Sequence, residues 1–138
     1  MAKRDKPLVR PLSPYMQYVN AQTVHTMGFS ILHRITGVAL TVGMMLLVYW
    51  FVAAASGPDG YAAAQTFFAS TWVQVLVAGW VFSFCYHFLN GIRHLVWDTG
   101  RGFEVATARK SGYAVFVAAI VLAALIVWAF CARLGGAA

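Results

Sequence analysis

The chain has 138 residues, of which 61% are hydrophobic and only 10% are charged. Soluble domains carry about 25% charged residues, so this composition excludes an ordinary soluble domain and indicates a small membrane protein. Lys and Arg outnumber Asp and Glu by 10 to 4, which gives a formal net charge of +6. Because the basic residues flank apolar segments, we interpret them as determinants of membrane topology rather than as a nucleic-acid-binding surface.

The N-terminal segment, residues 1–28, is expected to form a basic arm followed by a short interfacial helix. Ser13 followed by Pro14 is typical of a helix start, with the serine as the cap. Four residues then repeat at the spacing of a helix that lies on a membrane surface: Tyr15, Tyr18, Val19 and Gln22. The arm runs into prolines rather than into an apolar core, so we expect no cleavable signal peptide.

Three apolar segments are expected to cross the membrane as helices, at 29–55, 71–98 and 112–133. Each is long enough to cross a hydrocarbon core of about 30 Å. Residues 56–70, which open with the turn sequence SGPDG, and residues 99–111, which contain TGRG, are expected to form the connecting loops. The sequence therefore predicts an all-α membrane protein with three transmembrane helices and a short N-terminal interfacial helix.

The loops also predict the orientation of these helices. Lys and Arg are concentrated in the N-terminal arm and in the loop after the second span, whereas the loop between the first two spans has neither. The positive-inside rule places the N-terminus on the cytoplasmic side and the C-terminus across the membrane. We expect the bacterial inner membrane in preference to the mitochondrial inner membrane.

The second span carries polar residues along one side, where lipid alone would not stabilise them. On a helical wheel they share an arc about 100° wide. They are Ser83, His87, Asn90, Gly91, His94 and Asp98. Apolar residues are expected to cover most of the remaining circumference: Phe84, Tyr86, Phe88, Leu89, Ile92, Leu95 and Val96. A helix of this kind packs its polar stripe against something other than lipid.

His87 lies deepest among the histidines of this stripe, and helix–helix hydrogen bonding, proton relay and metal ligation are all open to it. Gly91, one turn further on, leaves room for a flat ligand beside His87, which favours haem. His87 and His94 point from the same helix face, whereas axial ligands approach a haem iron from opposite sides. If haem binds through His87, we expect the second ligand from another polypeptide, because His25 and His33 lie too shallow.

Several side chains gather at the cytoplasmic ends of the first two spans. Arg34, Arg93 and His94 are candidates to bind haem propionates, although snorkelling toward lipid headgroups explains either arginine equally well. Ser30 and Arg34 share a helix face, with His33 beside them. Together they are suited to hold a quinone carbonyl and supply protons. Spacing alone favours a simpler role, in which they cap the helix and contact phosphate headgroups.

Two segments resemble the signatures of a known family: SILHRITG at 30–37 and HFLNGIRHLVWD at 87–98. In these segments, and in the arm RPLSP at 10–14, the chain is similar to the succinate dehydrogenase cytochrome b556 subunits. These proteins are membrane anchors of respiratory complex II. The resemblance runs in order over nearly the whole chain and includes the three-span topology.

The resemblance implies roles for individual residues. His87 matches the axial ligand of haem b, and a histidine of a second membrane-anchor subunit supplies the other ligand within a heterodimeric haem-binding helical bundle. Ser30 and Arg34 match positions that line the ubiquinone site. His33 and His94 match positions close to the haem propionates and to that site.

Asp98 matches the aspartate that ends the second motif. Two roles are compatible with this position: an ion pair with Arg93 or His94, or a purely structural role.

The resemblance further implies a subunit that helps to reduce ubiquinone but does not itself act on succinate. Succinate is oxidised on a flavoprotein subunit, and the electrons arrive through an iron–sulfur subunit docked on the basic cytoplasmic face. This chain has no glycine pattern for binding a nucleotide and no cysteine cluster for an iron–sulfur centre. Cys85 and Cys131 are expected to be small apolar residues within helices.

Three other classes of protein compete with this interpretation. A fumarate reductase-type anchor shares the topology and the haem chemistry. A haem-free structural membrane anchor would use its histidines only for packing. A transporter or channel subunit would need polar residues along a path through the whole membrane. The first and third spans have almost no polar residues, and the polar stripe of the second ends at Ser83.

Overall fold

The computed structural model describes residues 21–135. It contains the helices α2 (Ala21–Ala55), α3 (Pro58–Ala69), α4 (Thr71–Asp98) and α5 (Val105–Gly135), and no strand within that range. Three stretches of these helices are long and apolar enough to cross a membrane: Met27–Ala55, Thr71–Asp98 and Val105–Arg133. The predicted class, an all-α membrane protein with three spanning helices, is confirmed. The predicted interfacial helix around Tyr15 and Tyr18 lies outside the described residues.

Two helices extend into segments that the sequence suggested were loops. α3 occupies most of residues 56–70 and begins with Pro58 in its first turn, where the missing N–H of proline costs no hydrogen bond. α5 begins at Val105, inside residues 99–111. Hydropathy marks only the part of a helix that lies in lipid, so polar first turns outside the hydrocarbon core escape it.

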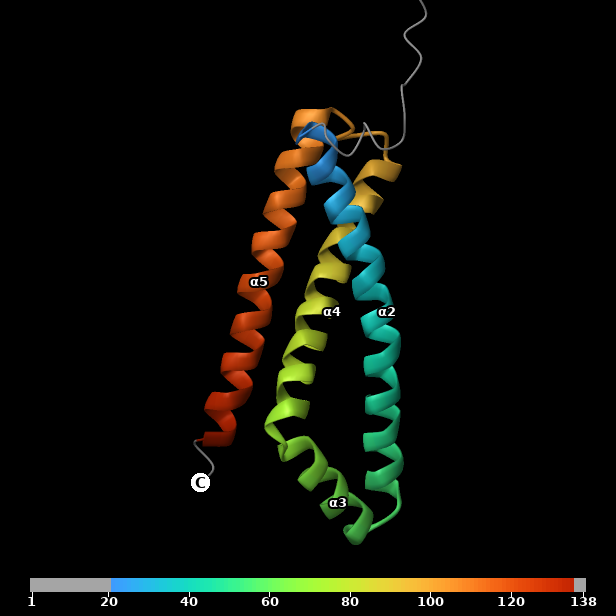
Figure 1. Cartoon of the computed structure of the whole chain (residues 1–138), viewed down its shortest axis with the longest axis vertical. Coiled ribbons are helices and arrows are strands. Elements are labelled where there is room, and N and C mark those ends of the chain that lie inside the picture. Colours follow the sequence, from blue (N-terminus) through green and yellow to red (C-terminus); the bar gives the residue numbers. More distant parts are fainter. Residues whose placement is uncertain (1–20, 136–138) are drawn as a thin grey trace, which may run out of the picture.

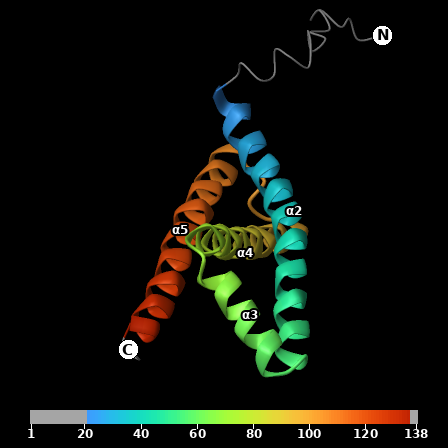
Figure 2. The same cartoon turned by 60° about the horizontal axis from the view of Figure 1, so that its bottom comes forward.

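α4 is the central helix, and it packs against both α2 and α5 (Figure 1). The start of α2, the end of α4 and the start of α5 converge at one end of the molecule, whereas α2 and α5 spread apart toward the other end. Figure 2 shows α4 nearly end-on, between the other two long helices, and α3 connects α4 to the far end of α2.

The best-packed part of the protein lies between α4 and α5. Cys85 and Tyr86 of α4 are buried there against the alanines Ala119 and Ala123 of α5. Small residues on one helix allow the two backbones to approach closely, which is the usual way in which membrane helices associate. The Tyr86 hydroxyl donates a hydrogen bond of 2.9 Å to the backbone carbonyl of Phe29 on α2.

The expectation that Tyr86 faces outward was therefore wrong, since none of its surface is exposed. α2 and α5 cover two sides of α4. The part of the α4 surface that faces outward is therefore narrower than we expected from one polar stripe. Phe84, Phe88, Ile92, Leu95 and Val96 do lie on the outside of this chain.

α2 and α4 meet closely at Gly43. A Cβ atom at this position would overlap the indole ring of Trp80, so only glycine fits without moving the tryptophan. Trp80 in turn donates a long hydrogen bond of 3.4 Å from Nε1 to the backbone carbonyl of Leu40. This contact fixes the spacing of α2 and α4 below the site described next.

Candidate functional site

A cluster of histidines lies between α2 and α4, near the end where the helices converge. The ring of His33 on α2 stacks on the ring of His87 on α4, with 3.9 Å between centroids and 13° between planes. The ring of His94, further along α4, lies 5.5 Å from that of His33. The structure thus brings His33 of α2 together with two histidines of α4 that lie far from it in the sequence.

The ring of His87 is held through one of its two nitrogens. Its Nδ1 lies 3.2 Å from the backbone carbonyl oxygen of His33 and 3.3 Å from the hydroxyl oxygen of Thr36. A carbonyl oxygen can only accept a hydrogen bond, so we assign the ring proton to Nδ1. Nε2 then carries the lone pair, and it has no hydrogen-bond partner within residues 27–133, whose side chains the structure describes. A neutral imidazole with one nitrogen held and the other free is the form that binds metals.

His33 has an unsatisfied nitrogen in the same cluster. Its Nδ1 is buried and has no hydrogen-bond partner in the described part of the chain. A buried polar atom without a partner is costly and rare in folded proteins, so it indicates a position where another group binds. Two imidazole nitrogens of this cluster, Nδ1 of His33 and Nε2 of His87, are therefore left without a partner in the described residues.

Arg93 lies in a different place from the one that the sequence suggested. It is only 8% exposed and points into the contact between α4 and α5. Its guanidinium donates to Ser111 Oγ at 2.9 Å, to Asn90 Oδ1 at 3.2 Å and to the backbone carbonyl of Ala108 at 2.7 Å. It also lies 4.0 Å from the ring centroid of Trp97, a cation–π contact.

Both expectations for Arg93, binding propionates and snorkelling toward headgroups, were therefore wrong. Its donors are used within this chain, and they do not reach Asp98. Asp98 is exposed and forms no ion pair with any residue that the structure describes.

Ser30 and Arg34 lie on the outer side of α2, one turn apart, and both are exposed. Neither side chain forms a hydrogen bond or an ion pair with another described residue. Both are consequently available to a ligand or to another subunit.

The remaining polar members of the α4 stripe have different surroundings. Ser83 is buried and donates to the backbone carbonyl of Gly79 at 2.9 Å, while Asn90 is buried beside Arg93. A Cβ atom at Gly91 would meet nothing within 4 Å. Packing within this chain therefore does not require glycine at position 91, and space is open there.

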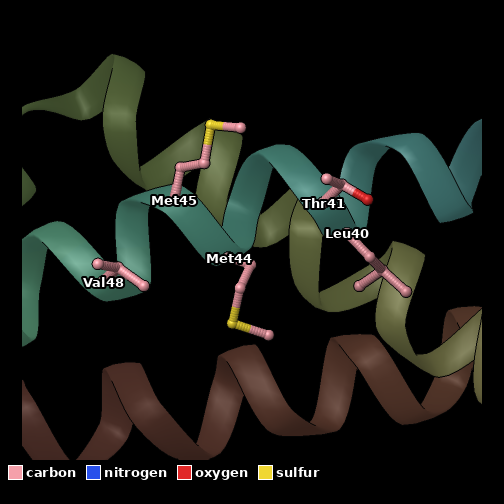
Figure 3. A pocket seen from close by; sticks show the side chains of 5 residues that line it. All are labelled: Leu40, Thr41, Met44, Met45 and Val48. Atoms are coloured by element: carbon pink, nitrogen blue, oxygen red, sulfur yellow. The ribbon is translucent and has the colours of Figure 1, made fainter.

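An open groove lies elsewhere on α2, where α2 and α5 spread apart. It has a volume of about 570 Å³ and is lined by Leu40, Thr41, Met44, Met45 and Val48. The side chain of Met44 points from α2 toward α5 (Figure 3). This groove has no charged lining residue, and none of the histidines lines it.

The fold and the histidine cluster define a class of protein, a three-span membrane subunit with unsatisfied imidazoles between two of its helices. The chain belongs to the family described as "Succinate dehydrogenase/Fumarate reductase transmembrane subunit", whose model matches residues 6–126. It is therefore a membrane subunit of that family of oxidoreductase complexes.

Curated relatives support this assignment over most of the chain. The succinate dehydrogenase cytochrome b556 subunit of Paracoccus denitrificans is 37% identical over 121 residues, which cover 88% of this chain and 92% of that protein. The subunit of the same name in Rickettsia prowazekii is 35% identical over 117 residues, covering 85% and 90%. The mitochondrial cytochrome b560 subunit of succinate dehydrogenase in Bos taurus is 32% identical over 123 residues, covering 86% and 70%. The family resemblance of the two sequence motifs is thus confirmed.

Proposed function

We propose that this chain is the cytochrome b membrane anchor of a succinate dehydrogenase, and that it binds haem b and helps to form a ubiquinone-reduction site. The observation that carries the proposal is the state of His87, whose Nδ1 is held by hydrogen bonds while Nε2 is left free. The names of its relatives, cytochromes b556 and b560, agree with a haem-binding role.

His87 is the proposed axial ligand of the haem iron, through Nε2. When bound, haem b supplies one-electron redox chemistry within the membrane. We propose that a histidine of a second membrane-anchor subunit would supply the other ligand, because the described ring of His33 is stacked on that of His87 and His94 projects from the same side of α4 as His87. His33, with its unsatisfied Nδ1, His94 and Arg34 are the proposed partners of the haem propionates.

Ser30 and Arg34 form this chain's part of the proposed ubiquinone site. Their exposure and their lack of partners in the described residues support that role. The Arg34 guanidinium stabilises negative charge that develops on a quinone oxygen, and the Ser30 hydroxyl donates a hydrogen bond to it. His33 lies next to Arg34 on the same helix and is the proposed proton donor because of that proximity.

The subunit does not act on succinate in this proposal. A flavoprotein subunit oxidises succinate, and an iron–sulfur subunit on the cytoplasmic face passes the electrons to the quinone. The excess of Lys and Arg in the N-terminal arm and around residues 99–111 supports a cytoplasmic N-terminus in a bacterial inner membrane.

A fumarate reductase anchor is the second candidate, because the description of the matching family includes both complexes. It would use the same haem chemistry with electrons flowing in the opposite direction. The relatives named above are all subunits of succinate dehydrogenase, which favours the first candidate.

The proposal is tested by the dithionite-reduced minus oxidised optical spectrum of the purified complex. We expect a b-type band from the wild-type chain, loss or shift of that band with His87→Ala, and a band of normal size with the control Thr41→Ala, whose hydroxyl bonds only to the backbone carbonyl of Gly37. A normal band with His87→Ala would remove His87 as the ligand. Absence of the band from an assembled wild-type complex would leave a haem-free structural anchor.

A further inference from the structure

The hydroxyl of Thr36 occupies a particular place beside His87. Thr36 is only 2% exposed, and its hydroxyl donates a hydrogen bond of 2.9 Å to the backbone carbonyl of His33. With its own hydrogen directed there, the Thr36 oxygen presents a lone pair to His87 Nδ1, 3.3 Å away. The hydroxyl therefore acts as an acceptor toward the imidazole.

We propose that Thr36 is a positioning residue for His87. In this proposal, which rests on the proposed haem-binding function, the Thr36 hydroxyl and the His33 carbonyl together hold the Nδ1–H group of His87. They thereby fix the tautomer that has its lone pair on Nε2, and they fix the direction in which that lone pair points.

The effect on the ligand follows from general coordination chemistry. A metal-binding histidine almost always donates its second ring N–H to a nearby acceptor, which orients the ring and raises the basicity of the ligating nitrogen. A more basic ligand stabilises ferric over ferrous iron. The Thr36 hydroxyl thus tunes the reduction potential without touching the haem.

Gly37 supplies the steric part of the same arrangement. A Cβ atom at Gly37 would lie 3.2 Å from Cε1 of His87, closer than nearly all real Cβ contacts. Position 37 follows Thr36 on the same side of α2, one turn beyond His33. Glycine therefore lets the imidazole ring lie close to α2, where the Thr36 hydroxyl reaches it.

Threonine also suits this position for its shape. A threonine hydroxyl in a helix readily bonds to the carbonyl three residues earlier, and this contact selects one side-chain rotamer. Valine has nearly the same shape but no hydroxyl, so Thr36→Val removes the acceptor and preserves the volume. Thr36→Ser keeps the hydroxyl and removes only a methyl group.

The test is a redox titration of the b-type band in the purified complex, carried out on three variants. We expect Thr36→Val to reduce the preference for ferric iron on the order of tenfold, because one acceptor of the Nδ1–H group is lost while the His33 carbonyl remains. A tenfold change corresponds to a rise of about 59 mV in midpoint potential for a one-electron couple. Thr36→Ser should keep the wild-type potential.

Thr41→Val is the matched control. Thr41 lies on the same helix and its hydroxyl bonds to a helix carbonyl in the same manner, at 3.2 Å from the backbone oxygen of Gly37, but it does not contact His87. Its replacement should leave the potential unchanged.

An unchanged potential with Thr36→Val would overturn the proposal, and so would equal shifts with Thr36→Val and Thr36→Ser. If Thr36→Val does not assemble, Thr36→Cys, a weak acceptor of similar size, is titrated in its place. Failure of both to assemble would also overturn it, because the hydroxyl would then serve folding. Loss of the proposed function itself would be seen separately, as a missing b-type band in the wild type.

Discussion

Buried polar groups have hydrogen-bond partners on the α5 side of α4, whereas on the α2 side two imidazole nitrogens have none in the described residues. Toward α5, the Arg93 guanidinium is buried and all three of its nitrogens donate hydrogen bonds within the chain. Toward α2, a buried nitrogen of His33 has no partner in the described residues, and Nε2 of His87 is free as well. A satisfied buried cation stabilises the fold, whereas an unsatisfied buried nitrogen indicates a ligand that this chain does not itself supply. We infer that the contact with α5 is structural and that the contact with α2 is functional.

The largest effect is expected from Arg93→Met. This change removes a buried cation and leaves the Asn90 side chain without its partner, at a cost on the order of 3 kcal/mol. We expect a much lower yield of assembled complex and a lower thermal unfolding temperature, measured on detergent-purified material. The haem content of each complex that does assemble should stay at the wild-type level. Assembly at the wild-type level would contradict the structural role of Arg93.

The next largest effect is expected from Arg34→Gln. Loss of the guanidinium removes a charged donor from the proposed quinone site, and we expect kcat/KM for the quinone to fall about 100-fold. Steady-state quinone reductase assays of the purified complex measure this, with Arg133→Gln in the exposed last turn of α5 as the control. A reduction in kcat/KM of the same size in the control would show a general charge effect instead.

Ser30→Ala should act at the same site with a smaller effect. A single neutral hydrogen bond contributes about 1 kcal/mol, so we expect kcat/KM for the quinone to fall about fivefold while the haem spectrum stays unchanged. The quinone reductase assay measures kcat/KM, and an optical spectrum of the same complex measures any change at the haem. A spectral change without a kinetic change would assign Ser30 to the haem instead.

The smallest effect on stability is expected from Gly91→Ala. The added methyl group would meet nothing within the described part of this chain, and alanine is favoured over glycine inside a helix, so the free energy of unfolding should rise by about 0.5–1 kcal/mol. Gly91 lies one turn from His87, however, and the methyl group should lower haem occupancy if the flat ligand uses this space. Haem content per complex, measured beside the melting temperature, distinguishes the two. Normal occupancy would place the haem away from Gly91.

The sequence predicted the spanning helices well, because about 20 apolar residues in a row have few explanations other than a membrane helix. It did not predict α3. Residues 58–69 begin inside the turn sequence SGPDG and are rich in alanine, so no long apolar run marks them as a helix. The early start of α5 at Val105 was not predicted for a related reason: its first turns are polar, and hydropathy does not mark them as part of a spanning helix.

The sequence offered candidate site residues, but it could not give their contacts. A helical wheel gives the direction of Arg93 from its own axis but says nothing of Ser111 and Ala108 on the neighbouring helix, which satisfy the guanidinium. Likewise, Thr36 stood within the first motif without a role, because its contact with His87 joins residues 51 positions apart. Its position three residues after His33, on the same helix face, was the one available signal. The roles of all the predicted site residues stay predictions: His87, His33, His94, Ser30 and Arg34.

The contrast between the two sides of α4 is tested most directly by the haem-to-flavin ratio of purified complexes that carry His87→Ala or Arg93→Met. We predict that His87→Ala assembles in normal amounts with an altered or lost b-type band and a reduced ratio. We predict that Arg93→Met assembles in small amounts with a normal ratio. The reverse pattern, normal haem with His87→Ala and haem-free complexes with Arg93→Met, would contradict the assignment of the α2 side as the functional one.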